Sequence, residues 1–159
     1  MKHRLACLTL AALAVAAGSA QAQQVRLMTG PQGGVWVPLG GALKNMWEKA
    51  IPGLSVQTMP GAGIANIRGV DEGKADVGFG NSISSVDGIN GVAPFPQKVT
   101  KVCQLANLYP QYFQMVALAS SGVNSVADMK GKTIAVQPRG NTAEAISQHI
   151  LRAVGMSYE

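Results

Sequence analysis

The residues best suited to chemistry lie in a glycine-rich run after the first predicted strand. Residues 29–40 read TGPQGGVWVPLG and open a predicted helix, with Pro38 suited to its first turn. Glycine permits positive φ and lets backbone approach a ligand closely. A helix N-terminus adds unpaired N–H groups and a partial positive charge. The run therefore favours binding of an anion such as a carboxylate or phosphate, and a tight strand-to-helix turn without a ligand is the alternative.

Three further polar turns follow predicted strands, at residues 60–66, 80–82 and 138–142. Ligands collect at the carboxyl ends of the strands in an open parallel sheet, so we expect all four turns at one edge. Arg139 is the most attractive carboxylate partner, because its guanidinium donates two parallel hydrogen bonds. A solvated loop charge is the alternative interpretation of Arg139.

These turns must be positioned by alternating strands and helices. The sequence predicts strands at residues 25–29, 54–59, 75–79, 99–108, 112–119 and 133–137. It predicts helices at residues 38–50, 64–72 and 142–154, a short helix capped by Asn81 or Ser82, a loop at 88–96 and a helical turn at 125–129. This alternation predicts an α/β fold with a largely parallel sheet, in which strands 99–108 and 112–119 lie near the middle.

Catalytic and metal-binding patterns are not evident. Asp71, Glu72 and Asp76 are the nearest acid–base candidates, but they lie away from the predicted ligand edge and lack a partner nucleophile. Cys103 sits in an apolar run, which predicts a buried small hydrophobe, and His149 is predicted as a surface or half-buried residue of a helix. The spacing forms no metal-ligand cluster, so we expect no enzyme activity, no cofactor and no metal.

The first 22 residues are typical of an export signal. A basic start is followed by an apolar run at residues 5–17 and by the small-x-small site Ala20-Gln21-Ala22, which predicts cleavage after Ala22. The apolar run is too short for a spanning helix, although an uncleaved anchor is the alternative. Loss of Lys2 and Arg4 lowers the formal net charge from +5 to +3. The remaining charges are scattered, which indicates no nucleic-acid partner, and we expect a periplasmic protein without stable membrane insertion.

Four blocks in order resemble the TAXI family of solute receptors, which serve TRAP-type tripartite transporters. The blocks are TGPQGGVWVPLG at 29–40, PGAGIAN at 60–66, GKADVGF at 73–79, and SVADMKGKTIAV at 125–136 followed by GNT at 140–142. The resemblance covers essentially the whole chain after the leader. It implies a two-lobed periplasmic binding protein of type II that closes over a small carboxylate, such as glutamate, glutamine or a related acid. The ligand would then pass to TRAP-type membrane permease subunits.

The same resemblance implies which residues bind the ligand. They form three groups: one wall of the site, a set of amide, hydroxyl and backbone contacts, and an approach from the second lobe. In that order the groups are Gly33, Gly34 and Trp36; Asn66, Asn81 and Ser82; and Arg139, Asn141 and Thr142. Val37 follows Trp36 where family members often carry a second aromatic residue, so one aromatic contact is missing here.

The resemblance also implies the domain organisation. Residues 23–119 would form lobe one, and residues 120–159 would form the start of an incomplete lobe two, because members of this family are considerably longer. A truncated, non-functional fragment is therefore one alternative. A receptor for another transporter class, of the ABC or tricarboxylate type, is a second alternative with a similar fold.

Overall fold

The strand β1 (Gln23–Met28) is the centre of a three-stranded parallel sheet with the order β2-β1-β3. It pairs along its whole length with β2 (Leu54–Met59), and at Leu27 and Met28 with β3 (Val77–Gly78). This computed structural model describes residues 23–158. The predicted leader, with its cleavage site after Ala22, lies outside the described residues.

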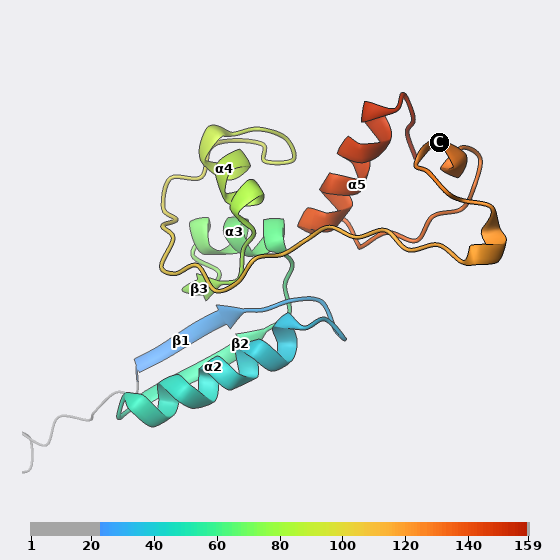
Figure 1. Ribbon diagram of the computed structural model, residues 1–159. Coiled ribbons are helices and arrows are strands. Elements are labelled where there is room, and N and C mark those ends of the chain that lie inside the picture. Colours follow the sequence, from blue (N-terminus) through green and yellow to red (C-terminus); the bar gives the residue numbers. More distant parts are fainter. Residues whose placement is uncertain (1–22, 159) are drawn as a thin grey trace, which may run out of the picture.

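Helices cover both faces of this sheet (Figure 1). The chain moves from β1 to β2 in one direction and then returns past β1 to β3. Right-handed crossovers therefore place α2 (Trp36–Ala50) on one face and α3 (Gly63–Asp71) on the other. The helix α4 (Ser82–Asn90) packs against α3. The predicted α/β class with a parallel sheet is confirmed.

The main hydrophobic cluster lies between α3 and the segment that follows α4. It consists of Ile64 and Ile67 from α3 with Phe95 and Val99 from the segment after α4. Gly88 of α4 permits this packing, because a Cβ there would lie 3.2 Å from atoms of both Phe95 and Val99. The cluster therefore fixes the pair α3–α4, whose N-termini face the carboxyl edge of the sheet.

The predicted elements of the first half of the chain are largely confirmed. The strand β2 has its predicted bounds, and α2 begins two residues earlier than predicted, at Trp36. The strand β3 is shorter than residues 75–79. The helix α4 continues to Asn90, beyond the predicted start of a loop at residue 88, and ends at Gly91, whose φ of 68° suits a helix C-terminus.

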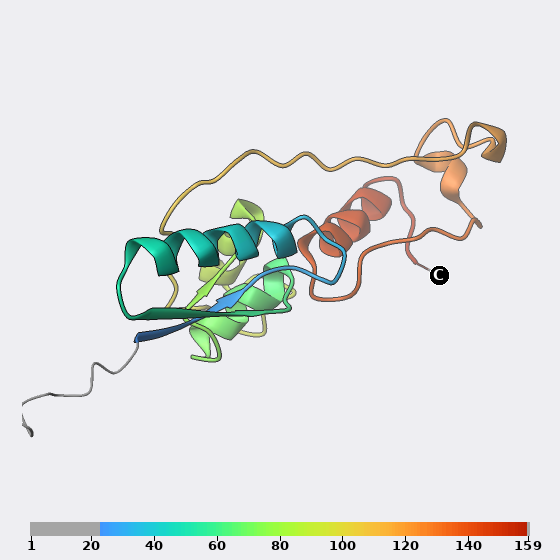
Figure 2. The same cartoon turned by 90° about the horizontal axis from the view of Figure 1, so that it is seen from below.

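The strands predicted at 99–108, 112–119 and 133–137 are wrong for this structure. Figure 2 shows residues 99–118 as a long extended coil, and none of these segments pairs within the described chain. Apolar alternation favours a strand, but a strand also needs a neighbour to complete its hydrogen bonds. Without one, the apolar side chains remain exposed, Leu105 by 74% and Val116 by 94%. Cys103 is exposed too, which corrects the prediction that it is buried.

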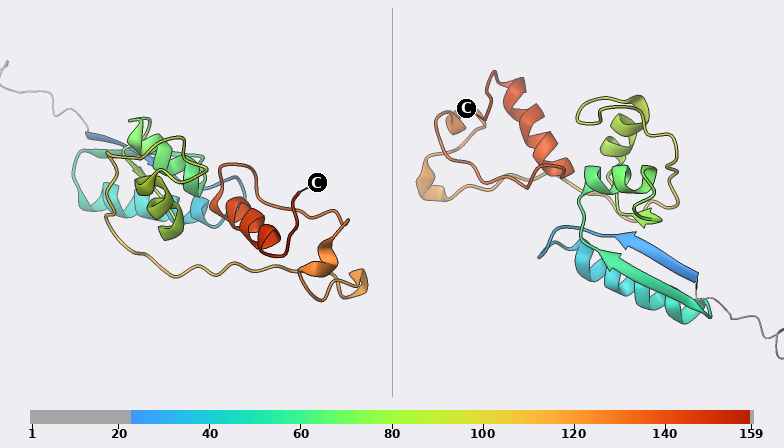
Figure 3. Two further views of the ribbon diagram at one scale, coloured as in Figure 1. Left: turned by 90° about the horizontal axis from the view of Figure 1, so that it is seen from above. Right: turned by 180° about the vertical axis from the view of Figure 1, so that it is seen from behind.

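The last part of the described chain is built around α5 (Thr142–Ala153). Two short 3₁₀ helices precede it, η1 (Ala119–Ser121) and η2 (Ala127–Met129). In both views of Figure 3, α5 lies beside α3 and α4, while η1 and η2 lie farther out. A cavity of about 170 Å³ separates α5 from the two extended segments at residues 113–116 and 134–136. No helix within residues 23–158 has the length and apolarity needed to cross a membrane.

Candidate ligand site at the carboxyl edge of the sheet

Three helix N-termini meet at the carboxyl edge of the sheet. The helices α3 and α4 begin there after β2 and β3, and α5 arrives from the far end of the described chain. The approach is so close that a Cβ on Gly63 would lie 2.7 Å from Asn81 Oδ1 and would also collide with Thr142 Oγ1. The sequence-based prediction that these turns share one edge is therefore confirmed for the turns before α3 and α4. The turn before α5 lies beside them, although the strand predicted to precede it is not formed.

Asn66 braces this edge from below. Its side-chain Nδ2 donates to the carbonyl oxygens of Thr29 (2.7 Å) and Phe79 (2.8 Å), which lie just after β1 and β3. Its Oδ1 accepts from the N–H of Ala62 at 3.0 Å. Because Asn66 is 1% exposed and both of its polar groups are bonded, we assign it a structural role instead of the predicted ligand contact.

The glycine-rich loop after β1 owes its glycines to backbone geometry. Gly33 has a φ of 80°, a conformation that favours glycine. Gly34 donates its N–H to Pro31 O at 2.9 Å, and a Cβ on Gly34 would lie 3.0 Å from the same oxygen. These two glycines therefore form the tight turn that delivers Trp36 to the start of α2.

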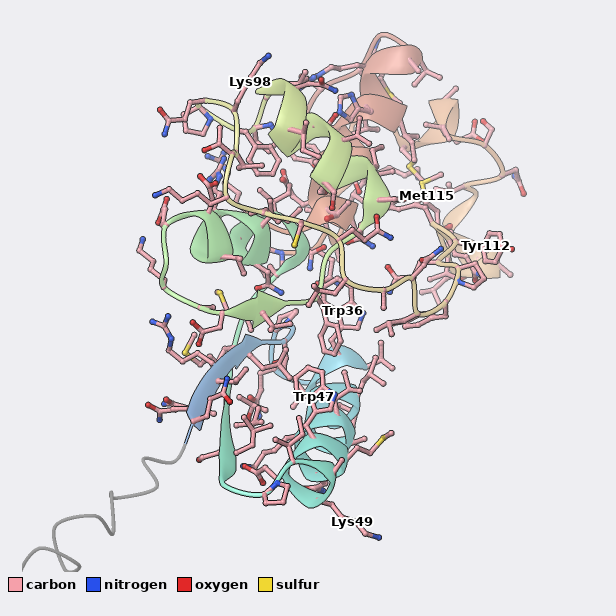
Figure 4. The ribbon with its side chains drawn as sticks, turned by 90° about the vertical axis from the view of Figure 1, so that its left-hand side faces the viewer. Trp36, Trp47, Lys49, Lys98, Tyr112 and Met115 are labelled. Atoms are coloured by element: carbon pink, nitrogen blue, oxygen red, sulfur yellow. The ribbon has the colours of Figure 1, made fainter. Side chains whose placement is uncertain are left out.

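Trp36 connects this loop to the rest of the edge. Its ring lies 5.6 Å from the ring of Phe79, measured between centroids. Its indole Nε1–H donates to the Tyr109 hydroxyl at 2.8 Å. Gln111 donates its Nε2–H to the same hydroxyl at 2.9 Å, and its Oε1 accepts from Asn81 Nδ2. Figure 4 shows Trp36 where the start of α2 meets the extended segment.

The hydrogen bond from Asn81 to Gln111 has a consequence for α4. Asn81 occupies the N-cap position, but its side chain makes no cap bond to the first turn of α4. The helix α3 likewise has no side-chain cap, and neither helix carries an acidic residue in its first turn. The N-terminus of α4, with Ser82 and Ile83 exposed, therefore keeps its positive end open to an anion. The first turn of α3 is more enclosed, because Gly63 is buried and the N–H of Ala65 donates to Gly140 O.

The N-terminus of α5 is different. Asn141 caps it by accepting from the N–H of Ala143 at 2.9 Å. Glu144 places a buried carboxyl group in the first turn, which complements the positive end of that helix. Asn141 thus has a local structural task, and α5 contributes less positive potential to the edge than α3 and α4 do.

Thr142 fastens α5 to α4. Its Oγ1 lies 2.7 Å from Ser84 Oγ, and both side chains are buried. A backbone bond adds to this contact, since the N–H of Ala65 donates to Gly140 O at 3.2 Å. Thr142 therefore holds the edge together from its buried side.

Arg139 and Ser82 are, with Gly33, the exposed members of the predicted ligand residues. Ser82 is exposed in the first position of α4. Arg139 is exposed in the turn before α5, and the neighbouring Gly140 is bonded to the first turn of α3. Arg139 is thus one residue from that contact, and it adds an exposed positive charge near the N-termini of α3 and α5.

The acidic residues considered for acid–base chemistry are engaged in structural contacts. Asp76 forms two hydrogen bonds with the guanidinium of Arg26, at 2.8 and 3.0 Å, and these lower the pKa of Asp76 to about 2. Asp71 accepts from the N–H groups of Lys101 and Thr100, which lowers its pKa. Within residues 23–158, no three His, Cys, Asp or Glu side chains are grouped to hold a metal.

Sequence reasoning missed Gly63, Ser84, Tyr109 and Gln111. A usable signal was present for two of them, because Tyr109 and Gln111 are polar interruptions of an apolar run. Their partners Trp36 and Asn81 lie 73 and 30 positions away, so only the fold brings them together.

A comparison with known protein families identifies the family of this chain. Residues 27–159 match the model of the NMT1-like family. The chain belongs to the NMT1-like family. This family is one of periplasmic-binding-protein-like proteins, so membership supports a solute-binding role and a transporter partner. The parallel sheet with helices on both faces is consistent with this family, as one part of a two-lobed binding-protein fold.

Proposed function

We propose that this NMT1-like protein is an exported solute receptor that binds a small carboxylate and delivers it to a TRAP-type permease. One observation carries the choice of ligand. The N-termini of α3 and α4 meet at one edge, and both lack a side-chain cap and a first-turn acid. A carboxylate supplies the negative charge and the acceptor oxygens that such N–H groups require.

Arg139 gives this proposal a second source of charge. It lies beside the contact between Gly140 and the first turn of α3, and among residues 23–158 it belongs to no ion pair. A guanidinium that approaches a carboxylate already held by helix N-termini completes its neutralisation. Ser82, exposed at the start of α4, adds a hydroxyl and a backbone N–H.

Calorimetry with a matched pair of ligands tests the proposal. The full gene product, purified from a periplasmic extract, is titrated with L-glutamate, glutarate and the neutral analogue glutaramide. We expect at least one carboxylate to bind with a micromolar Kd and glutaramide to bind at least tenfold more weakly, since its amides carry no charge. Equal binding of the acid and the amide, or no carboxylate binding, would contradict the proposal.

Two variants sharpen this experiment. Arg139→Gln removes the charge beside α3, and we expect a loss of carboxylate affinity of about tenfold. Arg152→Gln is the matched control, because Arg152 is exposed in the last turn of α5, at the end opposite Thr142. If both variants lose affinity equally, the effect of Arg139 is one of overall charge.

Export and transporter type are further parts of the proposal. Cleavage after Ala22 predicts Gln23 as the first residue of the periplasmic protein, which N-terminal sequencing by mass spectrometry checks. An adjacent gene for a multi-spanning TRAP permease would support the transporter type. A neighbouring ABC or tricarboxylate permease would favour those receptor classes instead.

A further inference from the structure

The hydroxyl of Tyr109 occupies an unusual position among the polar groups of the edge. It accepts two hydrogen bonds, from Trp36 Nε1–H at 2.8 Å and from Gln111 Nε2–H at 2.9 Å. The Trp36 indole N–H can only donate. In this structure the Gln111 amide has its oxygen towards Asn81 Nδ2 and its NH₂ towards Tyr109.

A phenolic oxygen that accepts two hydrogen bonds has one function left, which is to donate its own proton. The two incoming donors also polarise the O–H bond and strengthen it as a donor. Tyr109 is 41% exposed, so the residue is not enclosed by the protein. Trp36 lies at the start of α2, and Asn81, linked to the hydroxyl through Gln111, lies at the start of α4. The hydroxyl is therefore at the same edge as the open N-terminus of α4.

We propose that Tyr109 is a ligand-binding residue that donates its hydroxyl proton to a carboxylate oxygen of the bound solute. This inference rests on the proposed function and adds a specificity residue to it. Trp36 and Gln111 then act as positioning residues, because they fill the acceptor capacity of the hydroxyl and leave only its donor. A ligand group that can only donate, such as an ammonium, finds no acceptor at this point.

The test compares Tyr109→Phe with Tyr112→Phe in the full gene product. Both variants remove one phenolic hydroxyl from the same extended segment, but Tyr112 is 80% exposed and takes no part in the contacts described above. We expect Tyr109→Phe to weaken glutarate and L-glutamate binding about tenfold or more. We expect Tyr112→Phe to bind as the wild-type protein does.

Nuclear magnetic resonance of the unmutated protein gives a second readout that does not depend on a variant. The indole N–H of Trp36 reports on the Tyr109 oxygen directly, since it donates to that atom. We expect saturating glutarate to shift this resonance and glutaramide to leave it nearly unchanged. A variant that fails to fold therefore does not decide the question alone.

The outcomes separate this inference from the proposed function. Carboxylate binding that survives Tyr109→Phe unchanged, with no shift of the Trp36 indole, would overturn the role of Tyr109 and leave the receptor proposal standing. Failure of the wild-type protein to bind any of the acids would overturn both. Loss of binding in Tyr109→Phe alone, with the indole shift, supports the assignment.

Discussion

Ser84 Oγ and Thr142 Oγ1 lie 2.7 Å apart in a buried contact that joins α4 to α5 across 58 positions of sequence. A buried hydroxyl pair of this kind stabilises only while both partners are present, because the survivor of a single substitution loses its partner. The stability lost on substitution of either residue therefore measures how strongly this pair holds α5 at the ligand edge.

Substitution of this pair should show strong coupling. We expect Thr142→Val to lower the free energy of unfolding by about 1–3 kcal/mol, because Ser84 is left unpaired. The double variant Ser84→Ala/Thr142→Val should cost less than the sum of the single variants. Urea unfolding of the four proteins gives the coupling, with the exposed Thr58→Val as control. Strict additivity would show that the hydroxyls do not interact in solution.

Asn66 should be among the most sensitive polar positions of the sheet edge. Asn66→Ala leaves the carbonyl groups of Thr29 and Phe79 without their buried donor, so we expect a loss of about 2–4 kcal/mol of stability. The exposed helix residue Asn45 offers a matched control, and Asn45→Ala should change stability by less than about 0.5 kcal/mol. Equal effects in a denaturant titration would refute the bracing role of Asn66.

Gly63 should tolerate no side chain, in contrast to Gly41. A Cβ at Gly63 collides with Thr142 and Asn81, whereas a Cβ at Gly41 of α2 meets nothing within 4 Å. We expect Gly63→Ala to displace α5 and to speed hydrogen exchange at the Ala65 amide, which donates to Gly140 O. Gly41→Ala should leave that exchange rate unchanged and stabilise α2 slightly. Unaltered exchange in Gly63→Ala would mean that the close approach is absent in solution.

The pair Arg26–Asp76 predicts a specific dependence of stability on pH. The pKa of Asp76 falls from 3.8 to about 2 in the folded protein, chiefly through hydrogen bonds from Arg26. A lowered folded pKa means that the pair stabilises the protein above pH 4 and that this contribution is lost as pH falls towards 2. We expect Asp76→Asn to lower Tm by roughly 3 °C at pH 6, and the difference to shrink as pH falls through 2.

A neighbouring surface pair provides the comparison for this pH series. Glu72 and Lys74 form an ion pair at 2.5 Å in which both side chains are largely exposed. We expect Glu72→Gln to change Tm by less than Asp76→Asn does at pH 6, because Asp76 accepts three hydrogen bonds from Arg26 in addition to its ion pair. A Tm difference for Asp76→Asn that persists undiminished at pH 2 would contradict the assignment of the carboxylate.

The sequence predicted the elements whose signals are local. Glycine and proline mark the ends of α2 and α3, and alternation marks β2, so these elements have nearly their predicted bounds. The strands expected at 99–108 and 133–137 depend on a partner strand, which no local pattern reports. The sequence predicted Asn66 at the correct edge. It did not predict that the Asn66 side chain binds the carbonyl groups just after β1 and β3, because those partners are distant in sequence. Tyr109 lies at this edge because its hydroxyl accepts a hydrogen bond from Trp36, which is 73 positions away in sequence.

The most direct test follows the backbone amides of α3 and α4 while a carboxylate is added. In a nitrogen–proton correlation spectrum of the full gene product, we expect glutarate to shift the amides of Gly63, Ser82 and Ile83 more than those of the distant residues Asn45 and Trp47. Glutaramide should leave all five nearly unchanged. Shifts confined to other parts of the molecule, or equal shifts with both compounds, would contradict a carboxylate site at these helix N-termini.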